Sequence, residues 1–295
     1  MDRKNFLKLL ALMPFTGVAM KLKNLNRLTE SFDPTDKMPV LFLGHGSPMN
    51  AIEENEFVRG FRRVSNEIQK PTAILCVSAH WETRGTMVTA MQNPPTIHDF
   101  GGFPRELFEV QYPAPGNPDL ARETREMIKT TKVELDHNWG LDHGAWSVIR
   151  HMYPDANIPV IQMSLDYTKD AQYHYNLAKE LAKLREKGVL IVGSGNMVHN
   201  LRQVDWRRLN DNFGYDWAIE ANEKMKRYIL DGDHEKLINY HKQGGSFNLS
   251  IPSPDHYLPL LYSLALADKN ESIDIFNDAP VGGSLTMTSV RIGSN

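Results

Sequence analysis

Three short apolar runs stand out along the chain, and each leads into small residues and then a histidine. The run at residues 40–43 leads to His45 in "LFLGHGSP", the one at 73–77 to His80 in "AILCVSAHW", and the one at 189–192 to His199 in "VLIVGSGNMVHN". Runs that are apolar at every position are typical of strands buried on both faces, as in parallel sheets covered by helices. We therefore expect three central strands, each ending at its histidine.

Between these runs the chain alternates helical and strand-like patterns. Helical spacing is found at residues 118–129, 144–152, 171–186 and 217–230, and strand-like segments at 133–135, 158–165 and 189–192, followed by "SIDIFN" and "GSLTMTSVRIG" near the end. Such alternation indicates strands and helices stacked in layers. The pattern predicts an α/β fold, a three-layer helix/sheet/helix sandwich.

Composition and charge narrow the functional classes. The chain has 295 residues, 41% of them hydrophobic, with a net charge of −3. This is ample for one core, and no shift of composition marks a boundary after residue 37, so we expect a single domain at 37–295. The charge favours neither nucleic acid nor an anionic membrane surface. Because Cys76 is the only cysteine, an internal disulfide and a multi-cysteine metal site are excluded.

Residues 1–36 have a different character and are predicted to be a leader and linker. A basic start is followed by an apolar segment too short to span a bilayer, so we expect no stable membrane association. The order Arg3-Lys4-Asn5-Phe6-Leu7-Lys8 resembles a twin-arginine export signal with lysine in place of the second arginine. An amphipathic helix explains the segment nearly as well. The sequence thus leaves open a cytoplasmic location, which we favour, and periplasmic export.

Three glycine- and proline-rich loops add further histidines. They are "NPPTIHDFGGFP" with His98, "WGLDHGAW" with His143, and "SPDHYLPLLY" with His256. Ligands of open α/β sheets bind beyond the carboxyl ends of the strands, so these loops can reach the same crevice as the strand-end histidines. We assign the remaining histidines to solvent or to structural roles: His137, His151, His174, His234 and His241.

A cluster of imidazoles without cysteines indicates a transition metal such as zinc, iron, copper or nickel. Two or three protein ligands with open positions make a catalytic site rather than a structural one. Iron(II) in such a site can bind an organic diol and O2 together, whereas zinc activates water for hydrolysis. The residues alone leave both chemistries open.

The motif series resolves this choice by resemblance. In order, it reads "FLGHGSPM", "SAHW", "PPTIHDFGGFP", "DHGAW", "GSGNMVHNL" and "PDHYLPLLY", between residues 39 and 293. It closely resembles the class III, LigB-type extradiol ring-cleavage dioxygenases, in the 4,5-DOPA extradiol dioxygenase-like branch. The resemblance implies a LigB-like fold around a mixed, largely parallel sheet. It also implies an enzyme that opens the ring of a DOPA-like catechol with O2.

The resemblance further implies roles for individual residues. His45, His80 and His256 correspond to metal ligands, and His199 to an active-site histidine that is either a fourth metal contact or an acid/base. His143 corresponds to a catalytic histidine that touches the substrate. The substrate pocket is expected to include Ser47, His98, Asp99 and Phe100.

The same resemblance implies one divalent metal, Fe(II) for ring cleavage, with Zn(II) expected in the isolated protein. A zinc-dependent hydrolase and a non-catalytic metal-binding protein on the same scaffold remain the alternatives. The sequence does not indicate an oligomeric state.

Overall fold

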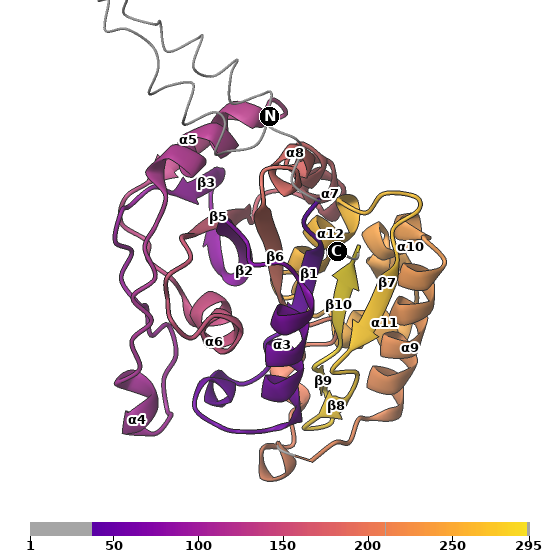
Figure 1. The fold of residues 1–295 in the computed structure, drawn as a ribbon. Coiled ribbons are helices and arrows are strands. Elements are labelled where there is room, and N and C mark those ends of the chain that lie inside the picture. The colour runs from indigo at the N-terminus through magenta and orange to yellow at the C-terminus, as the bar shows by residue number, and fades with distance from the viewer. Residues whose placement is uncertain (1–36, 210, 294–295) are drawn as a thin grey trace, which may run out of the picture. The chain divides into compact units, whose positions relative to one another are not determined.

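The computed structural model describes residues 37–209 and 211–293, which lie in one compact unit built on an eight-stranded sheet (Figure 1). The predicted leader, residues 1–36, lies outside the described residues. The strand order is β4-β3-β5-β2-β6-β1-β10-β7. The bounds are β1 Val40–Gly44, β2 Ala73–Thr83, β3 Thr86–Thr89, β4 Val133–Asp136, β5 Val160–Asp166, β6 Val189–Gly195, β7 Ile273–Phe276 and β10 Ser289–Ile292; β8 (Pro280–Val281) and β9 (Leu285–Thr286) form a separate small sheet.

The centre of the large sheet is parallel and its edges are not. Strands β5, β2, β6 and β1 run in the same direction, with Gly44 at the end of β1 opposite Gly195 at the end of β6. On one side β10 and β7 are added antiparallel, and on the other β3 pairs antiparallel with β5. The carboxyl ends of β1, β2 and β6 therefore meet at one edge of the sheet.

Both faces of the sheet are covered, which explains why the central strands are apolar at every position. On β1, Val40 and Phe42 enter one core cluster, while Leu41 and Leu43 enter the other. Side chains alternate between the faces of a strand, so both sets are buried only if helices cover both sides.

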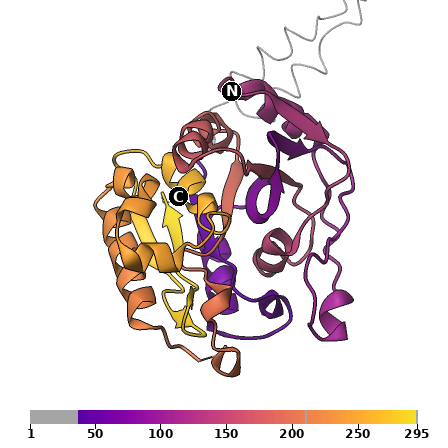
Figure 2. The same cartoon turned by 180° about the vertical axis from the view of Figure 1, so that it is seen from behind.

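Each core cluster contains residues of a different set of helices. Figures 1 and 2 show the ribbon from opposite sides. One face carries α3 (Glu56–Glu67), α4 (Arg105–Phe108) and α6 (His143–Met152). The other carries α5 (Pro118–Met127), α7 (Ala171–Lys179), α8 (Ala182–Arg185), α9 (Asp216–Leu230), α10 (His234–Ile238), α11 (Gly245–Ser250) and α12 (Leu258–Ala265). The predicted helix/sheet/helix sandwich around a mixed sheet is confirmed. Within the described ranges, no helix combines the length and apolarity needed to cross a membrane.

Two local expectations were wrong. The helix expected at residues 171–186 is two helices, because the backbone tightens between α7 and α8: the amides of Glu180 and Leu181 bond to carbonyls three residues back. Strand β2 does not stop at His80 but continues to Thr83, and its pairing with β5 is irregular between Val77 and Glu82. An irregularity of this kind re-aims side chains near a sheet edge, and His80 lies within it.

Candidate metal centre and active site

Neighbouring parallel strands bring His45, His80 and His199 to one edge of the sheet. His45 follows β1 directly, and its backbone amide donates to the carbonyl of Gly195 on β6 (3.0 Å). His80 lies near the end of β2, and His199 follows β6 by four residues. Their side chains therefore come from three adjacent strands.

A fourth histidine, His256, reaches this edge because Gly195 has no side chain. The carbonyl of His256 accepts a hydrogen bond from the amide of Asn196 (2.9 Å). A Cβ atom on Gly195 would lie 2.1 Å from that same carbonyl oxygen, closer than side-chain atoms are found. The glycine thus permits the close backbone approach that holds the loop before α12 against the sheet.

The ligand atoms of His45, His80 and His256 all lie within 4.8 Å of one another. The Nε2 atoms of His45 and His80 are 3.3 Å apart. A tetrahedral ion bound at about 2.0–2.1 Å to two imidazole nitrogens holds them roughly 3.3–3.4 Å apart. The three histidines therefore fit a shared metal ion, and three protein ligands leave room for further ones.

The tautomer of His45 follows from the hydrogen bonds of Ser194. The Ser194 hydroxyl donates its only proton to the carbonyl of Gly144 (2.5 Å). It must therefore accept from Nδ1 of His45, 3.0 Å away. Nε2 of His45 is left with its lone pair facing the other histidines, as metal binding requires.

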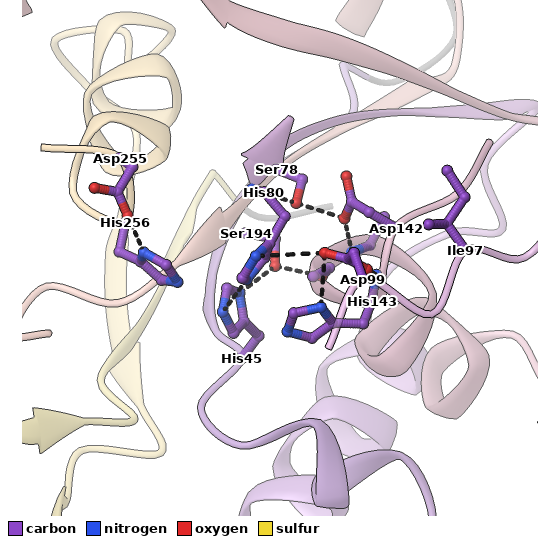
Figure 3. Close-up of polar contacts among 12 residues, drawn as sticks. His45, Ser78, His80, Ile97, Asp99, Asp142, His143, Ser194, Asp255 and His256 are labelled. Carbon is purple, nitrogen blue, oxygen red and sulfur yellow. Dashed lines mark hydrogen bonds and ion pairs between the residues drawn. The ribbon is translucent and has the colours of Figure 1, made fainter. Parts of the chain in front are cut away.

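Carboxylates orient two further rings in the same way (Figure 3). Nδ1 of His256 donates to Asp255, and Nδ1 of His143 donates to Asp99 (2.9 Å). The backbone amide of His143 also donates to Asp99 (2.8 Å). An ionised carboxylate only accepts hydrogen bonds, so the protons of these imidazoles lie on Nδ1 and their Nε2 atoms are free.

Asp99 also lies near His80, and thereby links two rings of the site. One of its oxygens is 3.5 Å from Nδ1 of His80. The ring centroids of His80 and His143 are 3.9 Å apart. Figure 3 shows His45 and His80 between His256 on one side and His143 on the other.

A buried polar group around Asp142 holds His143 at the start of α6. Asp142 caps this helix by accepting from the amide of Ala145 (3.1 Å), and it also accepts from Ser78 and Gln162 (both 2.6 Å). Ser78 precedes His80 by two residues, so one hydrogen-bond network supports both histidines.

His199 is placed differently from the three clustered histidines. Its ring is stacked on that of His256, with centroids 3.5 Å apart and an interplanar angle of 7°. Its backbone amide donates to the carbonyl of Ser250 (2.9 Å). His199 groups with Asp255 and His256 and does not belong to the His45–His80–His256 set.

Burial sets the protonation states of the site. It is the main cause that lowers the pKa of His45, His80 and His199, and neighbouring histidines lower it further. Burial acts to raise the pKa of Asp99 and Asp255, but hydrogen bonds from His143 and His256 outweigh it and lower both values. Neutral imidazoles and ionised carboxylates are the forms in which metal ligands and their supports bind a cation.

These histidines line a cavity of about 470 Å³. We call His45, His80, His143, His199 and His256 the histidine floor. The remaining side chains are mostly apolar, and we call the larger ones the apolar wall: Phe100, Phe103, Leu201, Trp206, Leu209 and Leu285. A concave site lined by convergent polar groups together with apolar side chains suits a small aromatic ligand.

The structure separates the four residues expected in the substrate pocket. Ser47 and Phe100 line the cavity. Asp99 lies behind His143 and acts through it. His98 is not among the described lining residues; its Nε2 lies 2.9 Å from the carbonyl oxygen of Val110 and its ring packs near Trp146.

Sequence reasoning missed several residues that shape the site. Asp255 stands directly before His256, and Ser194 lies within the Gly-Ser-Gly segment that ends β6, so the quoted motifs contained both without indicating their hydrogen bonds. Leu201, Trp206 and Leu209 come from a polar-looking segment whose apolar positions gave no periodic signal.

Comparisons with known proteins agree with this site. Residues 38–284 match the family described as the catalytic LigB subunit of aromatic ring-opening dioxygenase. The chain is 49% identical to a 4,5-DOPA dioxygenase extradiol of Escherichia coli (strain K12), over 87% of this chain and 95% of that protein. It is 36% identical to a 4,5-DOPA dioxygenase extradiol of Mirabilis jalapa, over 80% of this chain and 89% of that one.

The fold is also similar to a solved structure. The crystal structure of an uncharacterized protein from Escherichia coli K12 matches with a TM-score of 0.76 and 44% identity, covering 87% of this chain and all of that one. The family match, the relatives and the histidine floor point to the same chemistry. The chain belongs to the LigB family of aromatic ring-opening dioxygenases and is an extradiol catechol dioxygenase of the LigB-type class III branch.

Proposed function

We propose that His45, His80 and His256 hold one divalent metal and that Fe(II) is the ion with which the enzyme opens the ring of a DOPA-like catechol. The convergence of one ring nitrogen from each of these three histidines within 4.8 Å carries this proposal. Imidazole ligands suit iron and zinc alike, so the donor set fits either ion. When bound there, the metal would supply a binding point for the two catechol oxygens and the redox chemistry that O2 requires.

The protein's own contribution begins with orientation. Ser194 and Asp255 fix the rings of His45 and His256 through their Nδ1 atoms, and the ring nitrogen of His80 lies beside Asp99. Each support keeps a lone pair directed at the shared site, so little reorganisation is needed when a cation and a substrate bind.

His199 is proposed as the acid/base. Burial lowers its pKa, so the ring is neutral and can accept the proton that a catechol hydroxyl loses on binding. Its stacking on His256 places it beside the metal ligands. It can return the proton later in the reaction, which an imidazole does readily.

His143 is proposed to contact the substrate. Asp99 holds its Nδ1, and the ring lies next to that of His80 with its Nε2 free to hydrogen-bond. Phe100 packs edge-on against His143, with centroids 5.4 Å apart, and continues the surface into the apolar wall. A flat aromatic ring bound at the floor would therefore meet apolar side chains on its outer side.

A DOPA-like substrate is proposed because the relatives from Escherichia coli and Mirabilis jalapa are named 4,5-DOPA dioxygenases. Zinc exceeds Fe(II) in affinity for nitrogen sites, so purified protein is expected to carry some zinc. Zinc has no accessible second oxidation state, and its presence would not make it the working ion.

Reconstitution tests the proposal. Metal-free protein is loaded without oxygen with either Fe(II) or Zn(II), given DOPA, and then exposed to O2. We expect the Fe(II) form to consume O2 and give a yellow ring-opened product, and the Zn(II) form to do neither. Equal activity of the two forms would exclude the redox role, and hydrolysis of ester or amide substrates by the Zn(II) form alone would favour a hydrolase.

A further inference from the structure

The apolar wall has a feature that bears on substrate choice: it carries no charge. Among the described residues that line the cavity, the only ionisable side chains are the five histidines of the floor, and the other polar groups are the hydroxyl of Ser47 and the indole N–H of Trp206. None of these described lining residues is a lysine or an arginine that could pair with a carboxylate on the substrate.

The nearby carboxylates do not change this picture. Both oxygens of Asp99 accept hydrogen bonds from His143, and Asp255 is bonded to His256. They are directed at the histidines, and a carboxylate offers a second anionic group neither a hydrogen-bond donor nor a positive charge.

Residues 201–209, which supply Leu201, Trp206 and Leu209 to the wall, include three arginines, and none of them lines the cavity. Arg208 pairs with Asp211 (3.0 Å) and its guanidinium lies 3.6 Å from the centroid of the Phe213 ring. Arg202 and Arg207 are exposed and are not among the described lining residues.

The space beyond the wall is acidic. A second cavity of about 610 Å³ shares Ser47, Leu209 and Leu285 with the first, and is lined by three glutamates and one arginine: Glu53, Glu54, Glu56 and Arg59. The arginine is within 3.6 Å of Glu54, so its charge is partly neutralised. A substrate anion placed between the two cavities would meet net negative charge.

Trp206 stands out within the wall. It is 63% exposed although it is a large aromatic residue, and within residues 37–209 and 211–293 no aromatic ring is stacked on it. Leu201, which lines the same cavity, is 50% exposed. Exposed apolar side chains that line a cavity are typical of a surface that a ligand covers.

We infer that the cavity selects catechols whose ring substituent begins with an uncharged, apolar part, that it rejects those with a carboxylate on the ring, and that Trp206 covers this substituent. The inference rests on the proposed function and narrows its substrate class. A DOPA-like side chain meets the requirement, since a methylene group separates the ring from the charged groups. A benzoate does not, because its carboxylate would lie inside the cavity without a partner.

Two catechols of similar size test the inference: 4-methylcatechol and 3,4-dihydroxybenzoate. Their dissociation constants are measured by calorimetry on Zn(II)-loaded protein, and their kcat/KM values on the Fe(II) form. An unpaired charge is costly to bury, so we expect the benzoate to be at least about tenfold worse by both measures. Equal or tighter binding of the benzoate would overturn the inference. If neither compound nor DOPA is opened although 4-methylcatechol binds more tightly, the proposed function fails while the inference stands.

Variants test the wall itself. Trp206→Ala should raise KM for 4-methylcatechol several-fold with metal content unchanged, and Trp206→Phe should restore most of the loss. Tyr167→Ala is the matched control, because Tyr167 is an exposed aromatic residue outside the cavity. Leu201→Lys should improve binding of the benzoate relative to 4-methylcatechol. An unchanged KM in Trp206→Ala, or unchanged selectivity in Leu201→Lys, would contradict the role given to the wall.

Discussion

The histidine floor and the apolar wall line one cavity but are held by different forces. On the floor, His45, His143 and His256 each have a ring nitrogen hydrogen-bonded to a serine or a carboxylate. On the wall, Leu201 and Trp206 are largely exposed and contribute no side-chain hydrogen bonds among the residues described. Hydrogen bonds are directional, whereas apolar contacts are not.

This difference between floor and wall shows which part of the cavity requires precisely placed side chains. A metal site tolerates errors of only a few tenths of an ångström in its ligands, which is why hydrogen bonds that fix the rings of His45 and His256 matter there. A wall that only excludes water and matches an apolar substituent can vary more freely. We therefore expect changes on the floor to affect metal binding and turnover, and changes on the wall to affect substrate preference.

Loss of a proposed metal ligand should have the largest effect. Loss of a supporting residue typically costs 10–100-fold in metal affinity or activity, so His80→Ala should lower both by more than about 100-fold. The exposed His137 provides the matched control, His137→Ala. Metal content is measured by plasma mass spectrometry and folding by circular dichroism. A folded His80→Ala protein with full metal content would refute the assignment.

His199 should separate catalysis from metal binding. General acid/base groups typically contribute about 10²–10⁴-fold, so His199→Gln is expected to lose turnover by that factor while most of the metal stays bound. Metal content and kcat are measured on the same sample. Loss of metal to the same extent as in His80→Ala would instead make His199 a fourth ligand.

Gly195→Ala probes the floor without touching a ligand. The added Cβ would lie 2.1 Å from the carbonyl oxygen of His256, so the loop before α12 must shift. A displaced ligand should weaken metal binding by about 10–100-fold, as loss of an orienting contact does. Gly245→Ala is the control, because a Cβ there meets no atom within 4 Å. Wild-type metal affinity in Gly195→Ala would show that the close approach is not required.

Shortening a side chain of the wall should have a smaller effect than the changes on the floor, and it should affect KM rather than metal binding. Leu201 is half exposed, so Leu201→Ala removes only part of an apolar contact and should raise KM for DOPA by about two- to fivefold. Metal content and kcat should not change. A loss of metal in this variant would break the distinction between floor and wall.

Removal of residues 1–36 should have the smallest effect on the enzyme. The motif series begins at Pro39 and the site is built from residues 45–285 of the described chain. We expect protein beginning at Lys37 to keep its metal content and ring cleavage, measured beside the full chain. Aggregation or lost activity would show that these residues belong to the fold, and export through Arg3-Lys4 would then lose its main support.

The sequence predicted the sheet and the floor because both depend on local patterns. Unbroken apolar runs identified β1, β2 and β6, and parallel strands necessarily bring their ends to one edge. The placement of His45, His80 and His199 near one another followed from that rule. The glycine- and proline-rich loops indicated that His256 and His143 could reach the same crevice, and the motif resemblance supplied their roles.

Contacts between distant segments could not be predicted. The hydrogen bond from His45 to Ser194 spans 149 residues, and its direction depends on a third residue, Gly144. The length of β2 past His80 depends on an irregular pairing with β5 that local propensity does not encode. His98 was expected in the pocket because its glycine- and proline-rich loop could reach the crevice, yet its ring packs near Trp146 instead.

Isotope incorporation tests the central claim most directly. Fe(II)-loaded protein is given DOPA and ¹⁸O2, and the ring-opened product is trapped. Its mass is determined by mass spectrometry, with the His80→Ala protein as control. An extradiol dioxygenase inserts both atoms of one O2 molecule, so the account predicts a product with two ¹⁸O atoms, corrected for exchange with water, and none from the control. A DOPA product without ¹⁸O, or one formed equally by His80→Ala, would contradict it.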